Sequence, residues 1–303
     1  MIQILDENSS PTIRQLAKEL AGPELASVYF NPDFHFPENF KVYRLAKVIA
    51  NVPRAIALVT IPASSSLCEL GGIRALSDED FSLYSEELLL AAEEILIQNN
   101  CLIACCLYDH ERGSAKSKLA TLLGKHNWSS PTVNYIKYHF DCYSFKPHWF
   151  TRDTPLDPSF EIFKWEELEE EEKIRLLNLE SRFTYHPFIS PFADPNLIQN
   201  INSLGLRTES KVVGWIVTHT PSFAPDTVCY SAFYIDPACR HQNVAIPLLK
   251  KSIALQQQSP LRWSYFVINC DYTEENWMKF VNKRLAPYTF KIVEVIRRCK
   301  SFK

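Results

Sequence analysis

The stretch VCYSAFYIDPACRHQNVAIPLL, residues 228–249, decides the fold of this chain. It predicts an apolar strand, a turn marked by Pro237 and then a helix. Where a strand ends and a helix begins, several backbone N–H groups lack partners and point in one direction, with the positive end of the helix dipole behind them. This junction is therefore a candidate anion site, and a pyrophosphate suits it well.

The six residues of the junction, Arg240-His241-Gln242-Asn243-Val244-Ala245, resemble the acyl-CoA loop of the GCN5-related N-acetyltransferase (GNAT) family. The family pattern is Gln/Arg-x-x-Gly-x-Gly/Ala, so Arg240 and Ala245 match its ends and Asn243 replaces its central glycine. Asn tolerates positive φ, which makes this replacement physically mild. A strand–turn–helix without any ligand would produce the same stretch, so the surrounding sequence must decide between the two interpretations.

Length and composition limit the function classes. A chain of 303 residues can form two ordinary domains or one large one, and 46% apolar with 22% charged residues is typical of a soluble globular protein. The net charge of −3 without a basic block argues against a nucleic-acid partner. No apolar run has the length of a membrane span, and the start MIQILDENSS does not resemble a signal peptide. We therefore expect a cytoplasmic location.

Cysteine and glycine usage excludes several kinds of site. Most of the nine cysteines lie in apolar runs such as residues 101–107, there is no CxxC motif, and no Cys/His cluster has zinc-ligand spacing. We expect buried, reduced thiols and no metal. With seven glycines in the chain, a GxGxxG fingerprint and a Walker loop are both absent.

The segment 144–158 reads as a linker, because Pro147, Pro155 and Pro158 favour an extended connection over a helix. It divides the chain into residues 1–150 and 151–303. In the second half the pattern predicts helices at 165–181, 196–202, 244–257 and 274–284. It predicts strands at 206–209, 211–219, 228–235, 263–269 and 290–297. The order β-β-β-α-β-α-β resembles that of the GNAT fold.

The first half repeats the later part of this order. Strands are predicted at 55–61, 67–73, 101–107 and 133–141, and helices at 78–98 and 115–125. The junction after Ile73 has no acyl-CoA pattern, and Asp78 and Glu79 would repel a pyrophosphate there. The resemblance therefore implies a mixed α/β (α+β) fold with two tandem GNAT-like domains. Residues 1–150 form a degenerate copy, and residues 151–303 form the catalytic domain with the acyl-CoA site.

The resemblance also implies which residues bind acyl-CoA. In GNAT enzymes the fourth strand separates from the fifth, and the pantetheine arm enters the slot between them. That places Phe233, Tyr234 and Ile235 at the slot, although their side chains read equally well as ordinary core residues of a strand. The loop Arg240, His241, Gln242, Asn243, Val244 and Ala245 would hold the pyrophosphate, with Lys250 or Lys251 adding charge. Asn269 ends the next strand, where the family often places an Asn that bonds the pantetheine arm.

Acyl transfer to an amine needs a base for the amine and a group that holds or protonates the leaving thiolate. Tyr272 is the candidate acid, although the family's usual tyrosine lies further along that helix, where this chain has Phe280 and Lys283. Glu180, Tyr185 and His186 are candidates for the base in the loop on the acceptor side. Each has a structural alternative, for His186 the packing of the turn before Pro187.

Two further segments have simpler interpretations. The acid run of residues 166–172 is typical of a solvated helix face and first turn, or it attracts a cationic amine. The FHF segment around His35 has no identified partner and is assigned to the core.

The leading hypothesis is an acyl-CoA-dependent N-acyltransferase that moves an acetyl or longer acyl group to an amine of a small molecule or peptide by direct attack. No cysteine is paired with a histidine in a nucleophile setting, which argues against a covalent enzyme intermediate. The alternative is a non-catalytic acyl-CoA-binding or interaction module. In a variant of the first hypothesis, the N-terminal half captures the acceptor.

Overall fold

The computed structural model describes residues 2–31, 40–63, 67–182, 185–209, 211–273 and 275–302. His35 lies outside the described residues. The chain forms two compact units: unit 1 comprises residues 1–134 and 294–303, and unit 2 comprises residues 135–293. This division differs from the sequence boundary after residue 150. Each unit contains a strand from the other half of the chain, which a linear reading of the sequence does not reveal.

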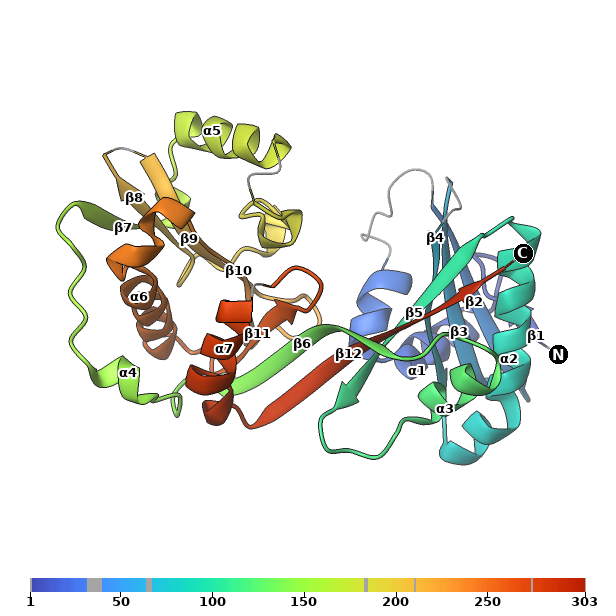
Figure 1. The fold of residues 1–303 in the computed structure, drawn as a ribbon. Helices are drawn as coiled ribbons and strands as arrows, with labels where there is room; N and C mark the ends of the chain where they lie inside the picture. Colours follow the sequence, from blue (N-terminus) through green and yellow to red (C-terminus); the bar gives the residue numbers. More distant parts are fainter. Residues whose placement is uncertain are drawn as a thin grey trace. The chain divides into compact units, whose positions relative to one another are not determined.

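Unit 1 contains a mixed sheet in the order β1-β2-β3-β4-β5-β12 (Figure 1). Neighbouring strands from β1 to β4 are antiparallel, and β4 is parallel to β5. The bounds are β1 (Ile2–Ile4), α1 (Pro11–Tyr29), β2 (Phe40–Ile49), β3 (Val52–Pro62), β4 (Leu67–Ala75), α2 (Asp78–Gln98), β5 (Ile103–Glu111), α3 (Lys118–Lys125) and β12 (Lys291–Ser301).

Strand β3 is buried on both faces, and its alternating side chains explain why. Ala57 and Val59 pack with α2 residues such as Leu88, whereas Ile56 and Leu58 pack with α1 residues. Successive residues of a strand point to opposite faces, so one apolar run of this kind needs a helix on each side. The helices α1 and α2 supply these two layers.

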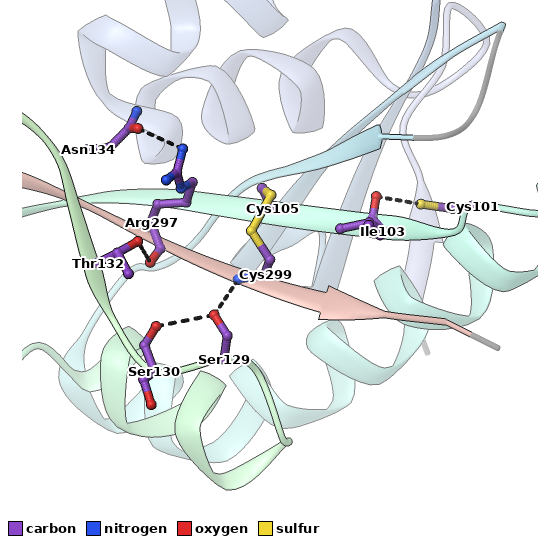
Figure 2. Close-up of a disulfide and its surroundings, with 9 residues drawn as sticks. All are labelled: Cys101, Ile103, Cys105, Ser129, Ser130, Thr132, Asn134, Arg297 and Cys299. Atoms are coloured by element: carbon purple, nitrogen blue, oxygen red, sulfur yellow. Dashed lines mark hydrogen bonds between the residues drawn. A yellow bond between two sulfur atoms is a disulfide. The ribbon is translucent and has the colours of Figure 1, made fainter. Parts of the chain in front are cut away.

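A disulfide joins Cys105 on β5 to Cys299 on β12. The two cysteines are 194 residues apart in sequence, and Figure 2 shows the bond between the two strands. The backbone N–H of Cys299 also donates to the Ser129 hydroxyl, over 3.0 Å. The expectation that all cysteines are reduced is therefore wrong for this pair. The sequence placed residue 299 in the other domain, so it gave no reason to bring these cysteines together.

Unit 2 repeats the pattern in the order β6-β11-β10-β9-β8-β7. Its strands are antiparallel except for the parallel pair β10–β11. The bounds are β6 (Thr132–Asp141), α4 (His148–Thr151), β7 (Phe160–Lys164), η1 (Trp165–Glu167), α5 (Glu170–Ser181), η2 (Pro187–Ile189), η3 (Pro195–Leu197), β8 (Leu204–Thr208), β9 (Lys211–His219), β10 (Thr227–Ile235), η4 (Pro237–Gln242), α6 (Ala245–Gln257), β11 (Trp263–Asn269), α7 (Glu275–Arg284) and η5 (Ala286–Tyr288). Helices α5 and α6 lie on different sides of this sheet (Figure 1).

The predicted strands and long helices of the second half are confirmed, with small shifts at their ends. Strand β7 has no counterpart among the predicted elements, and three further segments differ from their prediction. The helix predicted at 196–202 is the short η3 followed by a turn. The linker contains the helical turn α4, in which Trp149 is buried against Phe145. The acid run is not wholly solvated, because Glu172 is buried and pairs with Arg207 at 3.0 Å.

Before residue 55 the pattern assigns no element, yet β1, α1 and β2 lie there. Helix α1 is kinked at Gly22, whose φ of 77° is followed by Pro23, and this interruption hides the helical periodicity. In the part of the chain that the structure describes, no helix has both the length and the apolar character needed to cross a membrane.

Candidate functional site: a forked strand pair and a helix N-terminus

Strands β10 and β11 form a fork. Residues 227–230 of β10 pair with residues 263–266 of β11, and the last pair is Tyr230 with Phe266. Both strands continue, to Ile235 and Asn269, without pairing to each other. Separated parallel strands expose backbone N–H and C=O groups along the gap. The slot implied by the resemblance is therefore present.

A cavity of about 500 Å³ occupies this fork. It is bounded by β10, β11, α6, α7 and η2, and it contains eight of the predicted site residues: Phe233, Tyr234, Ile235, Arg240, Asn243, Ala245, Asn269 and Tyr272. Five others do not line it, namely Glu180, His186, His241, Gln242 and Val244. Residues 228–249 therefore contribute ten of the side chains that line the cavity.

Asn243 has the left-handed backbone conformation, with φ 55° and ψ 24°. It lies between the short helix η4 and α6, at the position where the family pattern has a glycine. The expectation that Asn243 tolerates positive φ is confirmed, because few residues with a Cβ adopt this conformation at low cost.

The N-terminus of α6 opens into the cavity. Ala245 and Ile246 form its first turn and line the cavity, and their N–H groups have no partner four residues back within the helix. Pro247 has no N–H, so this terminus offers fewer donors than most helices do. The side chain of Val244 is buried, so only the backbone of this predicted residue can reach a ligand.

Positive charge at the cavity comes from Arg240. Its Nε donates to the carbonyl oxygen of Ile235 over 3.2 Å, which holds the guanidinium beside the end of β10. Lys250, expected to add charge, instead donates to the Arg152 carbonyl oxygen over 2.6 Å. Lys250 therefore anchors the segment around Arg152, which precedes β7. Lys251 does not line the cavity.

Asn269 is buried at the end of β11 and lines the cavity. Its Oδ1 accepts a hydrogen bond of 2.9 Å from the Asp271 N–H. An Asn that accepts a hydrogen bond from the backbone two residues further on stabilises a turn, and it can do so while also contacting a ligand. The Nδ2 group is thus the part of this side chain suited to meet a carbonyl of a ligand.

Tyr272 and His186 stack with ring centroids 3.6 Å apart. Tyr272 lines the cavity and is 60% exposed. Nδ1 of His186 accepts the Phe188 N–H over 3.0 Å, so the neutral ring carries its proton on Nε2 and has no lone pair there for a base. The structural alternative for His186, packing the turn before Pro187, is confirmed, since this residue caps η2.

Glu180 does not line the cavity, and Tyr185 and Tyr234 connect it to the cavity wall. The Tyr185 hydroxyl lies 3.4 Å from the Glu180 carboxylate, and the Tyr185 ring packs on Tyr234 with centroids 5.6 Å apart. Burial, with a smaller contribution from the Glu180 charge, raises the pKa of Tyr185, so its phenol keeps its proton. Glu180 and Tyr185 thus lie behind the cavity wall.

The rest of the wall is largely aromatic. Phe233 stacks on Trp277, and Trp277 stacks on Phe280, with centroid distances of 5.3 and 5.1 Å. Phe280 lines the cavity in the region of α7 where the family's acid tyrosine is expected. Burial raises the pKa of Tyr230, whose hydroxyl donates to Gln256 over 2.8 Å and accepts from Asn202. The Tyr230 hydroxyl therefore makes its hydrogen bonds within the protein, and we assign this tyrosine a structural role.

The sequence analysis missed Ser231 and His219. Ser231 lines the cavity, and its hydroxyl contacts Nδ1 of the buried His219 on the neighbouring strand. The visible signal was a single serine in the apolar run of β10 and a histidine at the end of β9. Their pairing depends on a register shift that no local pattern specifies.

Unit 1 contains a similar fork that its own residues fill. Strand β4 pairs with β5 over residues 67–70, and beyond this point the Tyr29 side chain packs against Gly71 so closely that a Cβ there would overlap it. The N-terminus of α2 is capped internally, since Ser77 accepts the Asp80 N–H. Burial pushes the pKa of Asp80 up, but hydrogen bonds from Arg54 and Ser77 outweigh it and hold the pKa below its usual range. A carboxylate therefore already occupies the terminus where a pyrophosphate would bind.

Among the described residues, no group of three or more His, Cys, Asp or Glu side chains is placed to hold a metal ion. No protein-family model matches the chain, and no curated protein does either.

Solved structures match over the whole length. A tandem GNAT protein from the clavulanic acid biosynthesis pathway superposes with a TM-score of 0.70 at 8% identity, covering 99% of this chain and 98% of that one. A GCN5-related N-acetyltransferase from Sphaerobacter thermophilus gives 0.60 at 10% identity, covering 99% and 95%. A GNAT-family acetyltransferase from Colwellia psychrerythraea gives 0.57 at 12% identity and covers both chains fully. At these identities the likeness shows the fold: the chain has the fold of a tandem GNAT protein.

Proposed function

We propose that this protein is an acyl-CoA-dependent N-acyltransferase with one acyl-CoA site, located in unit 2. The observation that carries the proposal is that the fork of β10 and β11 and the N-terminus of α6 open into one cavity. A positively polarised helix end beside a narrow, largely apolar slot suits a ligand with a pyrophosphate at one end and a slender arm at the other.

The junction of η4 and α6 would hold the pyrophosphate. The N–H groups of Ala245 and Ile246 point from the helix N-terminus, and Asn243 turns the chain so that they face one side. Because Pro247 removes one donor, we assign a large share of the electrostatic attraction to Arg240. His241 and Gln242 are exposed and would contribute through their backbone.

The unpaired edge of β10 would hold the acyl-bearing arm. Between Ser231 and Ile235 the backbone has N–H groups that are not paired to β11, and one of them would stabilise the developing oxyanion of the thioester. The stacked rings of Phe233 and Trp277 form an apolar part of the cavity wall, and a hydrogen bond is stronger beside apolar groups than in water.

Direct attack by the amine is consistent with the state of two buried thiols of unit 2. Burial raises the pKa of Cys142 and of Cys229 to about 12, so both thiols keep their protons and are poor nucleophiles. Tyr272 lines the cavity, and we propose that its hydroxyl holds the leaving thiolate. The base roles predicted for Glu180 and His186 stay predictions that this geometry does not favour.

The donor is acetyl-CoA or a longer acyl-CoA, and the acceptor is an amine of a small molecule or peptide. The cavity lining includes apolar side chains that an acyl group could contact, among them Phe140, Phe145 and Ile253. Such a wall gains free energy with each added methylene, about 0.8 kcal/mol when fully buried. We therefore expect kcat/KM to rise from acetyl to medium acyl chains.

The test measures CoA release by the full chain from acetyl-, butyryl- and octanoyl-CoA with a panel of alkyl amines, amino acids and lysine peptides. Mass spectrometry identifies the amide product. Arg240→Glu is expected to abolish turnover through loss of acyl-CoA binding, whereas Lys116→Glu, the same charge reversal on an exposed residue of unit 1, leaves it unchanged. Absence of CoA release with every amine would overturn the proposal.

The alternative is a non-catalytic acyl-CoA-binding module. It is favoured by Phe280 in place of an acid and by the position of Glu180 and His186 outside the cavity. Binding of acyl-CoA without CoA release across the whole panel would establish it.

A further inference from the structure

A serine and a buried histidine lie in contact where β10 and β11 separate. Ser231 directly follows Tyr230, the last residue of β10 that pairs with β11, and the register between β9 and β10 shifts at this point. A shift of this kind is a β-bulge, which re-aims a side chain and is common beside active sites. Ser231 lines the cavity, and its hydroxyl contacts Nδ1 of His219.

The partners of His219 fix its tautomer. Nε2 lies 2.8 Å from the carbonyl oxygen of Ala193, which can only accept, so Nε2 carries the ring proton. In the neutral ring Nδ1 is then an acceptor, and the Ser231 hydroxyl donates to it. The Val217 carbonyl oxygen is a second acceptor 3.1 Å from Oγ, but a hydroxyl turned toward it would leave two lone pairs in contact at Nδ1.

This arrangement has the three parts of an activated hydroxyl: a hydroxyl group, a base bonded to it and a third group that orients the base. His219 is 7% exposed, so its bonds are shielded from solvent. If the ring takes a second proton, Nδ1–H donates back to Ser231 and Nε2–H still donates to Ala193. Both N–H groups of the imidazolium therefore have acceptors without any rearrangement.

We propose that Ser231 is a catalytic residue that accepts the proton of the attacking amine, and that His219 is the positioning residue that receives the serine proton in turn. The proposal rests on the acyl transfer proposed above. As the amine nitrogen bonds to the acyl carbon, its proton passes to Ser231 Oγ, and the proton that Oγ held passes to His219 Nδ1. The carbon–sulfur bond breaks, its electron pair leaves with the thiolate, and the proton returns through Ser231 to give the CoA thiol.

The other polar side chains of the cavity suit this task less well. The guanidinium of Arg240 has only hydrogen-bond donors to offer and cannot act as a base. Burial raises the pKa of Tyr234, so its phenol is a donor rather than a base. Ser231 instead combines a place in the cavity with a bond to an imidazole whose Nδ1 is an acceptor.

The test uses the full chain, acetyl-CoA and the amine of the panel that releases CoA fastest. Ser231→Ala and His219→Asn are expected to lower kcat by about 100-fold or more, the usual contribution of general base catalysis. The dissociation constant for acetyl-CoA and the KM for the amine stay close to those of the wild type. Ser231→Thr keeps the hydroxyl and suits a strand, so it is the matched control and retains kcat within a few-fold.

Retained kcat in Ser231→Ala, or a higher amine KM at unchanged kcat, would overturn the relay while leaving the acyl transfer intact. His219→Asn carries the test if Ser231→Ala does not fold, as judged by acetyl-CoA binding. An acetyl adduct on Ser231 after incubation with acetyl-CoA alone would also overturn the relay, because the serine would then be a nucleophile. A wild-type chain that binds acetyl-CoA but acylates no amine overturns the proposed function and the relay together.

Discussion

Asn243 is the residue on which the acyl-CoA assignment depends most directly. Its φ of 55° lies in the region where glycine is the usual residue, and it stands between η4 and α6, where the ligand's charge would be held. A residue with a Cβ and no local hydrogen-bonding side chain pays about 1–2 kcal/mol for this conformation. The replacement of the family's glycine is thus compatible with a working loop.

Asn243→Gly should therefore bind acyl-CoA as well as the wild type, and Asn243→Ala should bind it about tenfold more weakly, since about 1.4 kcal/mol corresponds to a factor of ten. Calorimetric titration of acetyl-CoA into each variant measures the effect. Equal loss of affinity in both variants would show that the Asn side chain, and not its φ, is what the loop needs.

At the scale of elements, the fork depends on the strands around it. Strand β11 pairs with β10 on one side for four residues only and with β6 on the other side over seven, from Trp263 with Asp141 to Asn269 with Tyr135. The position of Asn269 in the cavity is thus set chiefly by β6. At the closed end, Arg262 donates to Asp141 over 2.8 Å.

Asp141→Asn should lower the free energy of unfolding at neutral pH by less than about 1 kcal/mol, because Arg262 is 54% exposed and the pair is screened. Hydrogen bonds from Arg262, with those from Tyr143 and Ser144, hold the pKa of Asp141 below its usual range. The stabilisation is therefore present above the unfolded pKa and is lost as the pH falls through the lowered folded pKa.

Urea unfolding of wild type and variant at about pH 7 and at about pH 3, below the usual aspartate pKa near 3.9, measures this difference. The difference in free energy of unfolding between the two proteins should be smaller in acid than at neutral pH. A gap of the same size at both values would show that the carboxylate's charge has no part in the effect.

At the scale of the whole molecule, β12 is the strand that sequence reasoning assigned to the second domain, although most of it belongs to unit 1. Residues 294–303 belong to unit 1, where Cys299 is bonded to Cys105 and Lys300 pairs with Glu93 at 2.7 Å. The disulfide closes a very long loop of chain, which restricts the unfolded state.

Cys105→Ser should therefore lower the free energy of unfolding by about 2–4 kcal/mol under oxidising conditions. The wild type should show the same loss when a reductant is added, and the variant should show no further change. Intact mass under both conditions reports the bond through the mass of two hydrogens. A wild-type mass that reductant leaves unchanged would contradict the disulfide.

Sequence reasoning recovered what local chemistry determines. The strand, turn and helix around Asp236 and Asn243 follow from apolar periodicity and from residues that favour turns, so this strand–turn–helix junction was placed correctly in the chain. Sequence reasoning failed where the structure depends on contacts between segments that are far apart in the chain. The exchange of β12, the disulfide of Cys299 and the bulge that brings Ser231 to His219 all depend on pairing between strands, which no single stretch encodes.

The central claim is that one fork of the two binds acyl-CoA. In unit 1 Tyr29 fills the space beside Gly71 and Asp80 lies at the helix N-terminus, whereas in unit 2 the cavity remains open beside Arg240. Calorimetric titration of acetyl-CoA into the full chain tests this most directly. The account predicts one site per chain, lost in Arg240→Glu and kept in Lys116→Glu. Two sites, no binding, or unchanged binding in Arg240→Glu would contradict it.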